Sequence, residues 1–361
     1  MRFYKQTMLA STFLITSTTF SYADIKVVAS IKPIHSLVSA ISEGIGEPTL
    51  LVKGAGSPHT YSLKPSQAKE LQDADVIFWM GNDLEAFLEN SINNIAANAM
   101  TISLMESDKL TKLNFREGES FDDHGHDDHG HDKHDDHGHD KHDDHGHDKH
   151  DGHEHDKHDE HEHDKHDNHG HDKHDDLGHD KHDDHAHHDV DPHVWLDPLN
   201  AIVLVEEIKN ALISADPKNE PAYEENAKVT IEKLNQLIAE INMELEPVKG
   251  RGYLVFHDAY QYFENRFGVT AVGSITVSPE ILPGAERIRE IQNKVKSLDA
   301  TCVFSEPQFE PKLVATVTEN TNAGTGVLDP LGASISDGPQ LYFTLIKNMA
   351  NSLKKCMLRA K

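Results

Sequence analysis

A low-complexity tract from Asp122 to Asp189 constrains this chain more than any other feature. The chain has 361 residues and 29 histidines, and 25 of those histidines lie between His124 and His188. Lysine recurs at every eighth position from Lys133 to Lys181, and the tract contains one leucine and no aromatic residue. Such a segment has too little apolar surface to offset the conformational entropy lost on folding. We therefore expect residues 122–189 to be a disordered insertion, and a folded core must come from the sequence on either side.

The tract also dominates the charge of the chain. The formal net charge is −28, and residues 122–189 contribute −19 of it through 26 acidic residues and 7 lysines. The rest of the chain is mildly acidic, whereas nucleic-acid binding calls for a basic face. We therefore expect no nucleic-acid partner.

The N-terminus is typical of a secretory signal. Arg2 and Lys5 precede a short apolar run over residues 8–15, and Ser21-Tyr22-Ala23 is a small-x-small cleavage pattern. We expect residues 1–23 to be a signal peptide. No later window reaches the roughly 18 uninterrupted apolar residues of a membrane span, and no cysteine lies near the cleavage point to carry a lipid. The sequence thus predicts a soluble, exported protein.

Cys302 and Cys356 are the two cysteines of the chain. In an oxidising compartment, two cysteines most simply form one disulfide bond. That bond would tie the start of a predicted strand to the last predicted helix. Two buried free thiols are the alternative.

Short apolar segments alternate with amphipathic ones on both sides of the tract. The predicted strands are residues 25–31, 50–52, 75–80 and 100–104 before it, and 253–256, 269–276, 301–305 and 326–328 after it. This alternation predicts parallel α/β sheets. From Glu220 to Glu246, apolar residues repeat at spacings of three and four, which predicts one helix about 40 Å long. A helix of that length can act as a stiff connector between two α/β domains.

Four histidines lie outside the tract, and three of them occupy positions suited to a binding site. His59 follows a predicted strand after a short glycine-rich loop, and His257 follows another strand directly. His193 stands in Asp-Pro-His-Val-Trp-Leu-Asp-Pro, where foldable sequence resumes. Asp329 also ends a predicted strand, and ligands bind at this carboxyl edge of open parallel sheets. We expect His35, in the first turn of a predicted helix, to be a partly exposed or capping residue.

Each histidine taken alone is more simply a surface or hydrogen-bonded residue. Three of them at loop positions, in a chain that also has a histidine-rich tract, favour a metal site. Imidazole suits zinc, copper, iron and nickel, and three neutral imidazoles with one oxygen make a tetrahedral zinc site. A carboxylate-rich site would favour manganese instead. We therefore predict metal ligands at His59, His193, His257 and Asp329.

Several motifs together resemble the zinc-binding receptors of high-affinity ABC uptake systems (ZnuA type), from about residue 25 to the C-terminus. They are Gly-Ala-Gly-Ser-Pro-His59, Pro-His193-Val-Trp-Leu-Asp-Pro198, Val-Phe-His257-Asp-Ala-Tyr260, Glu306-Pro-Gln-Phe309 and Leu-Asp329-Pro-Leu331. The resemblance implies two α/β lobes, each with a small, mostly parallel sheet flanked by helices. It also implies one long rigid helix joining the lobes, zinc in the cleft on the three histidines, and a disulfide in the second lobe.

This sequence departs from the family pattern at one position. Some members have a glutamate just before the first histidine as a fourth ligand, and here that position is Pro58. Manganese-type relatives have a carboxylate at the position of His257, and Asp329 matches a ligand in those relatives. The fourth ligand is therefore water, Asp329 or a residue of the tract.

The resemblance and the pattern of elements predict four parts. These are a signal peptide (1–23), an N-terminal lobe (24–218) that contains the insertion 122–189, a linking helix (219–248) and a C-terminal lobe (249–361).

Our hypothesis is a monomeric periplasmic receptor, not an enzyme, that captures Zn²⁺ in the cleft. It would deliver the ion to the permease of an ABC importer, driven by the importer's ATPase. One alternative is a zinc-buffering or surface-adhesion protein that acts mainly through the tract, and another is a transporter component for a different metal. A zinc hydrolase would also use three histidines and water, but the sequence has no His-Glu-x-x-His motif.

Overall fold

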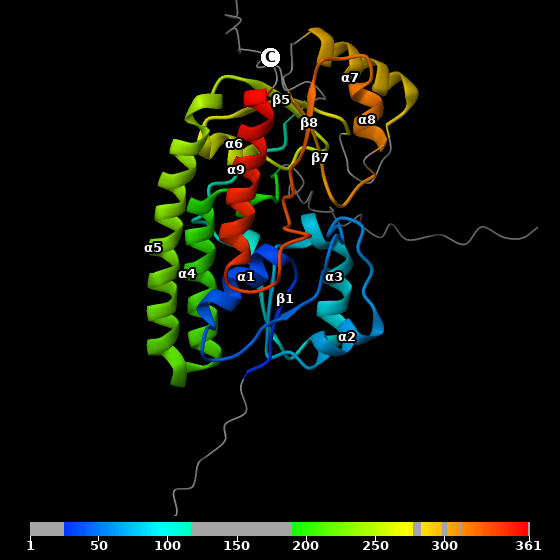
Figure 1. The fold of residues 1–361 in the computed structure, drawn as a ribbon. Helices are drawn as coiled ribbons and strands as arrows, with labels where there is room; N and C mark the ends of the chain where they lie inside the picture. Colours follow the sequence, from blue (N-terminus) through cyan, green and yellow to red (C-terminus); the bar gives the residue numbers. More distant parts are fainter. Residues whose placement is uncertain (1–24, 117–189, 277–282, 298–301, 311, 360–361) are drawn as a thin grey trace, which may run out of the picture. The chain divides into compact units, whose positions relative to one another are not determined.

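The computed structural model describes residues 25–116, 190–276, 283–297, 302–310 and 312–359. The predicted signal peptide and the tract lie outside these residues. The described residues belong to one structural unit, which contains two parallel sheets flanked by helices (Figure 1). Within the described part of the chain, no helix is long and apolar enough to cross a membrane.

The first lobe is built on a four-stranded parallel sheet in the order β2-β1-β3-β4. Its elements are β1 (Val27–Ala29), α1 (Lys32–Ile41), β2 (Thr49–Leu50), α2 (Pro65–Gln72), β3 (Val76–Trp79), α3 (Asn82–Ile95), β4 (Met100–Ser103) and α4 (Pro198–Ala215). The apolar runs of β1 and β3 are buried throughout, as expected for strands covered on both faces. Gly81, with a φ of +136°, allows the sharp turn from β3 into α3.

The second lobe repeats this strand order as β6-β5-β7-β8, again with every strand parallel to its neighbours. Its elements are β5 (Gly252–Val255), α6 (Gln261–Phe267), β6 (Thr270–Ser274), α7 (Ala285–Ser297), β7 (Cys302–Ser305), α8 (Lys312–Thr318), β8 (Gly324–Val327) and α9 (Leu341–Arg359). A disulfide between Cys302 and Cys356 joins β7 to α9. The predicted fold class and the predicted disulfide are both confirmed.

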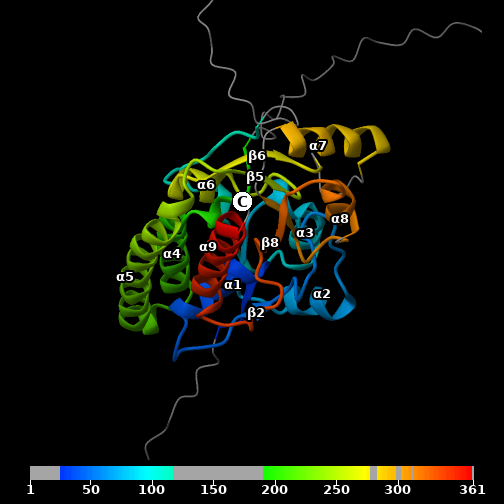
Figure 2. The same cartoon turned by 45° about the horizontal axis from the view of Figure 1, so that its top comes forward.

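The long predicted helix is α5 (Glu220–Leu245). It contacts α1 and α4 of the first lobe and α6 and α9 of the second, and Figures 1 and 2 both show it running beside α4. Helix α9 also contacts α1, so α5 is not alone in joining the lobes. One continuous apolar core contains residues of both sheets and of α1, α4, α5 and α9.

A buried lysine adds a polar connection between the lobes. The Lys32 side chain, at the start of α1, is 5% exposed and forms an ion pair with Asp337 at 3.0 Å. Its ammonium also donates to the carbonyl oxygens of Ile335 at 2.7 Å and Ala333 at 3.3 Å. The loop between β8 and α9 is therefore held by the first lobe.

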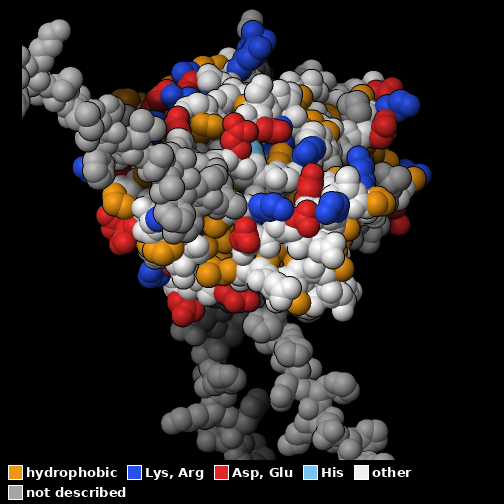
Figure 3. Space-filling model, turned by 90° about the horizontal axis from the view of Figure 1, so that it is seen from below, with side chains coloured by type: hydrophobic (Ala, Val, Ile, Leu, Met, Phe, Trp, Pro, Cys, Tyr) orange, Lys and Arg blue, Asp and Glu red, His pale blue; other side chains and the backbone are white. Residues whose placement is uncertain are grey.

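Charged side chains of both signs are interspersed on the face shown in Figure 3. Nucleic-acid binding would require a continuous basic surface. The described lysines and arginines of this face do not form one.

Candidate metal centre

Three imidazoles converge where the two lobes meet. His59 lies in the loop after β2, His193 immediately precedes the short 3₁₀ helix η2 (Val194–Leu196), and His257 follows β5. One ring nitrogen from each histidine lies within 4.8 Å of the other two. His193 is 3% exposed and His257 is 5% exposed. The structure therefore brings together residues that are far apart in sequence and leaves a gap of the size that one metal ion fills.

The loop that carries His59 is fixed by contacts on both sides. A Cβ at Gly56 would lie 3.0 Å from the ring of Tyr61 and 3.1 Å from Val52, so the absence of a side chain there permits the close packing of this loop. The amide of Gln67 donates to the carbonyl oxygen of Leu51 at 2.5 Å and to the Tyr61 hydroxyl at 2.9 Å. Helix α2 thereby positions both ends of the segment that presents His59.

Two buried carboxylates orient the other two histidines. Nδ1 of His193 lies 2.6 Å from an oxygen of Asp191, and Nδ1 of His257 lies 2.7 Å from an oxygen of Glu306. Each Nδ1–H donates to its carboxylate, so each Nε2 is left with a lone pair for a metal. Nε2 of His257 is buried and has no hydrogen-bond partner among the described residues. This arrangement fits a divalent cation coordinated by imidazole.

Burial and neighbouring charges affect the histidines differently. Burial lowers the pKa of His59 to about 2, and the proximity of His193 and His257 adds to the effect. For His257, burial lowers the pKa, but the ion pair and hydrogen bond with Glu306 outweigh burial and the net shift is upward. In the absence of a metal, His59 is therefore a neutral ligand over the whole physiological range.

The space between the imidazoles suits a single ion. The cavity has a volume of about 10 Å³, close to that needed for one water molecule. Its wall includes Trp195, Phe309 and Leu331 besides the three histidines. The ring of Phe309 packs edge-on to His257 with a centroid separation of 5.8 Å. Apolar walls around a small polar centre strengthen electrostatic contacts to an ion inside it.

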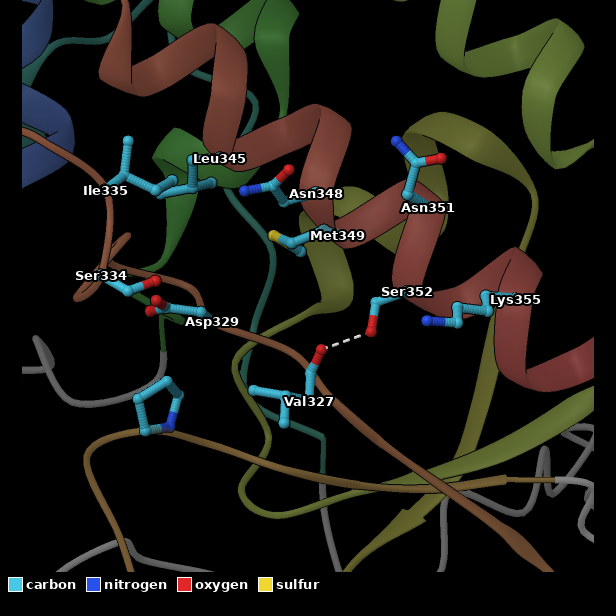
Figure 4. A pocket seen from close by; sticks show the side chains of 11 residues that line it. Val327, Asp329, Ser334, Ile335, Leu345, Asn348, Met349, Asn351, Ser352 and Lys355 are labelled. Carbon is cyan, nitrogen blue, oxygen red and sulfur yellow. Dashed lines mark hydrogen bonds between the residues drawn. The ribbon is translucent and has the colours of Figure 1, made fainter.

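Asp329 is not grouped with the three imidazoles. Its carboxylate accepts hydrogen bonds from the backbone N–H groups of residues 331–333 at 3.1, 2.9 and 2.6 Å, and from the Gln308 amide at 3.2 Å. It lines a second cavity of about 330 Å³, where Figure 4 shows it beside Ser334. His35 is also elsewhere: it is 7% exposed, and its Nε2 lies 3.0 Å from the carbonyl oxygen of Pro48.

Sequence reasoning did not assign roles to Asp191 and Glu306. Both lie inside motifs that the sequence had singled out, and Glu306 follows strand β7 as His257 follows strand β5. An acidic residue at a strand end, near a predicted histidine ligand, is the signal that would have indicated an orienting carboxylate.

Two α/β lobes with a three-histidine centre where they meet define a metal-binding receptor of the solute-binding class. The chain belongs to the ZnuA family, zinc-uptake complex component A, periplasmic, whose model matches residues 27–356. The members of that family are components of a zinc-uptake complex and not enzymes.

Similar proteins agree with this assignment. The chain is 54% identical over 331 residues to the high-affinity zinc uptake system protein ZnuA of Brucella abortus (strain 2308), covering 92% of this chain and 91% of that protein. It is 37% identical to the protein of the same description from Haemophilus influenzae, over 93% and 94% of the two chains.

Solved structures share the fold. A crystal structure of ZnuA matches with a TM-score of 0.67 at 21% identity, over 92% of this chain and 99% of that one. A zinc-bound deletion variant of ZnuA matches with a TM-score of 0.65 at 21% identity, over 92% and 98%.

Proposed function

We propose that this chain is a periplasmic receptor that captures Zn²⁺ on His59, His193 and His257. It then delivers the ion to the permease of an ABC importer, which is driven by a cytoplasmic ATPase. The observation that carries this proposal is the convergence of three ring nitrogens within 4.8 Å, two of them set by buried carboxylates. The receptor acts as a monomer after removal of the signal peptide 1–23.

The division of the chain follows from this function. Residues 24–218 form the lobe that supplies His59 and His193, and residues 249–361 form the lobe that supplies His257. The segment 219–248 links the two lobes. The insertion 122–189 is an accessory acidic segment that attracts cations.

The ligand set suits transport because zinc prefers tetrahedral sites of nitrogen, sulfur and oxygen ligands. Water, Asp329 and a residue of the tract are the candidates for the fourth position. Water needs no rearrangement, whereas Asp329 would have to exchange its backbone hydrogen bonds for the ion.

Substitution of Asp329 by Asn separates Asp329 from the other two candidates. If water completes the site, D329N lowers stability by about 1–2 kcal/mol through a weakened turn and leaves zinc affinity within about threefold. A loss of affinity of about 100-fold or more in a folded D329N protein would identify Asp329 as the fourth ligand. Zinc affinity is measured by competition with a chelator, and folding is measured by a urea titration.

The main test is zinc calorimetry on residues 24–361 and on the same chain without residues 122–189. We expect one tight site in both proteins, and additional weak sites in the full chain alone, because a tract that must become ordered on binding loses affinity. H59A, H193A and H257A should each abolish the tight site.

A different result would favour the alternative function. If tight binding disappears together with the tract, the three histidines are not a sufficient site, and a buffering protein that acts through the tract replaces the receptor.

A further inference from the structure

The two chain segments that flank the tract lie side by side. Asn114 and Val190 form an antiparallel β-bridge, and the N–H of Asp191 donates to the carbonyl oxygen of Leu113 at 2.8 Å. We call residues 111–116 together with residues 190–191 the strap. Residues of the strap contact both lobes.

The strap is attached to the first lobe at one end. The N–H of Thr111 donates to the Asn200 side chain at 2.9 Å, and the Asn200 amide returns a bond to the carbonyl oxygen of Thr111 at 2.9 Å. Asn200 lies in the first turn of α4 and is 2% exposed. This reciprocal pair fixes where the strap leaves the first lobe.

Helix α6 of the second lobe holds the middle of the strap. The Tyr262 hydroxyl accepts from the N–H of Leu113 at 2.9 Å and donates to the carbonyl oxygen of Asp191 at 2.7 Å. The Gln261 amide donates to the carbonyl oxygen of Asn114 at 3.1 Å and to Oδ2 of Asp191 at 3.2 Å. Two neighbouring side chains of α6 thus bind both strands of the strap.

The Gln261 contact bears directly on the metal centre. Asp191 is fully buried, and its Oδ1 accepts from both the backbone N–H and Nδ1 of His193. Gln261 binds the other oxygen of the same carboxylate. Loss of that donor would leave one oxygen of a buried carboxylate without its partner, which costs more than the hydrogen bond itself contributes.

Arg116, at the end of residues 111–116, binds two acidic residues of the second lobe. Its guanidinium binds both oxygens of Asp258 and both oxygens of Glu264, with Nε 2.9 Å from Asp258 and Nη1 2.9 Å from Glu264. Asp258 follows His257 directly in sequence, and Glu264 also accepts the N–H of Ala271 at 2.9 Å. Arg116 is therefore a bidentate link between the strap, the His257 turn and strand β6.

We propose that Gln261 and Arg116 are positioning residues of the zinc centre: Gln261 sets the Asp191 carboxylate that orients His193, and Arg116 sets the turn that presents His257. This inference rests on the proposed function. It makes tight zinc binding depend on the strap even though the strap supplies no ligand.

The test uses the full chain with Q261L and R116M, and with R266M as a matched control. Arg266 also lies on α6 and also forms a bidentate pair, with Asp197 at 2.7 Å, but it contacts neither Asp191 nor Asp258 in the described residues. Zinc affinity is measured by chelator competition, the geometry of the centre by the visible absorption of bound Co²⁺, and stability by the metal-free melting temperature.

We expect Q261L and R116M each to weaken zinc binding by about 3- to 10-fold and to alter the Co²⁺ spectrum. This is less than the roughly 10- to 100-fold loss on removing a direct partner of a metal ligand, because each residue acts on its histidine through a second residue. R116K, which keeps the charge but loses the fork, should lie between R116M and the wild type. R266M should bind zinc as the wild type does. If R116M does not fold, R116K tests the role of Arg116, and Q261L tests the role of Gln261.

Unchanged zinc affinity and an unchanged Co²⁺ spectrum in Q261L would overturn the role of Gln261. The same result in R116M, or in R116K if R116M does not fold, would overturn the role of Arg116. An equal loss in R266M would overturn both roles, because it would indicate a general loosening of the protein. If H193A retains tight binding, the proposed zinc site itself is wrong. If H193A loses tight binding while the Gln261 and Arg116 variants bind zinc as the wild type does, only the two positioning roles are refuted.

Discussion

His193 and His257 each donate Nδ1–H to a buried carboxylate, whereas His59 has no carboxylate partner among the described residues. The orientations of these two imidazoles are therefore fixed. His59, neutral because its pKa is about 2, completes the centre from a loop of the first lobe. The carboxylates that hold the rings are therefore as informative about binding as the rings themselves.

Exchange of Glu306 for Gln tests this at the second lobe. We expect E306Q to weaken zinc binding by about 10- to 100-fold, because the amide carries no charge and cannot stabilise the His257 ring as the carboxylate does. The measurement is chelator competition, with E310Q as the control because Glu310 is exposed in the same loop. Equal affinities for E306Q and E310Q would show that the ion pair with His257 does not support the site.

Glu85 is a buried acid with no part in the centre. It is fully buried in α3, accepts the N–H of Met80 at 2.7 Å, and has non-helical backbone angles of −126° and 47°. Burial raises its pKa from 4.5 to about 7, although the hydrogen bond from the N–H of Met80 opposes the shift. The folded protein therefore binds this proton more tightly than the unfolded chain does.

The pH dependence follows from that difference. The stabilisation from the protonated Glu85 is full below pH 4.5 and is lost as the pH rises toward about 7. The whole change is roughly 3 kcal/mol. We expect urea titrations of the metal-free protein at pH 5 and pH 8 to show the wild type losing this stability relative to E85Q. An equal change in the free energy of unfolding between pH 5 and pH 8 for the two proteins would contradict the raised pKa of Glu85.

Among the elements, strand β7 and helix α9 are the pair with a covalent link. The Cys302–Cys356 disulfide closes a loop with a sequence separation of 54, and both cysteines are buried. We expect C302A/C356A to lower the free energy of unfolding by about 2–4 kcal/mol and to leave zinc affinity unchanged, because neither cysteine lines the histidine cavity. Urea titration and chelator competition measure the two effects. A large loss of affinity would mean that the disulfide also shapes the centre.

The elements show how far the sequence could be interpreted. The spacing of three and four predicted α5 over residues 220–246, and the helix spans Glu220–Leu245. Helix α2 begins at Pro65, with Lys64 as its N-cap. Proline fits the first turn because its missing N–H has no partner there anyway.

The predicted strand ends indicated which histidines belong to the candidate site. They did not indicate which cavity each neighbouring residue lines. Glu306 and Gln308 line the histidine cavity, whereas Pro307 between them lines the cavity near α9. In the same way Pro330 lines the histidine cavity and Asp329 lines the cavity near α9. Which residues of a turn face which cavity depends on backbone angles and long-range packing, and a motif does not specify these. The ligand set His59, His193, His257 and Asp329 therefore stays a prediction.

At the scale of the whole molecule, charge is distributed very unevenly. Of the net −28, residues 122–189 carry −19. We expect this segment to raise the local concentration of cations, so that at about 10 mM salt the full chain captures zinc roughly tenfold faster than the chain without it. Stopped-flow competition with a fluorescent chelator measures the rates. Rates that stay different by the same factor at about 1 M salt would exclude an electrostatic cause.

The apolar core includes residues of both sheets, and Lys32 binds the second lobe. We therefore expect the two lobes to unfold as one cooperative unit. Heating should thus give a single calorimetric transition. Because the three-histidine centre exists in the folded form alone, free zinc at 100 times the Kd of this centre should add about 2.7 kcal/mol to the stability of that whole unit. The measurement uses the chain without residues 122–189, so that zinc bound by the tract in either state does not contribute. The occupancy of one small cavity then becomes readable from the melting temperature of the entire protein.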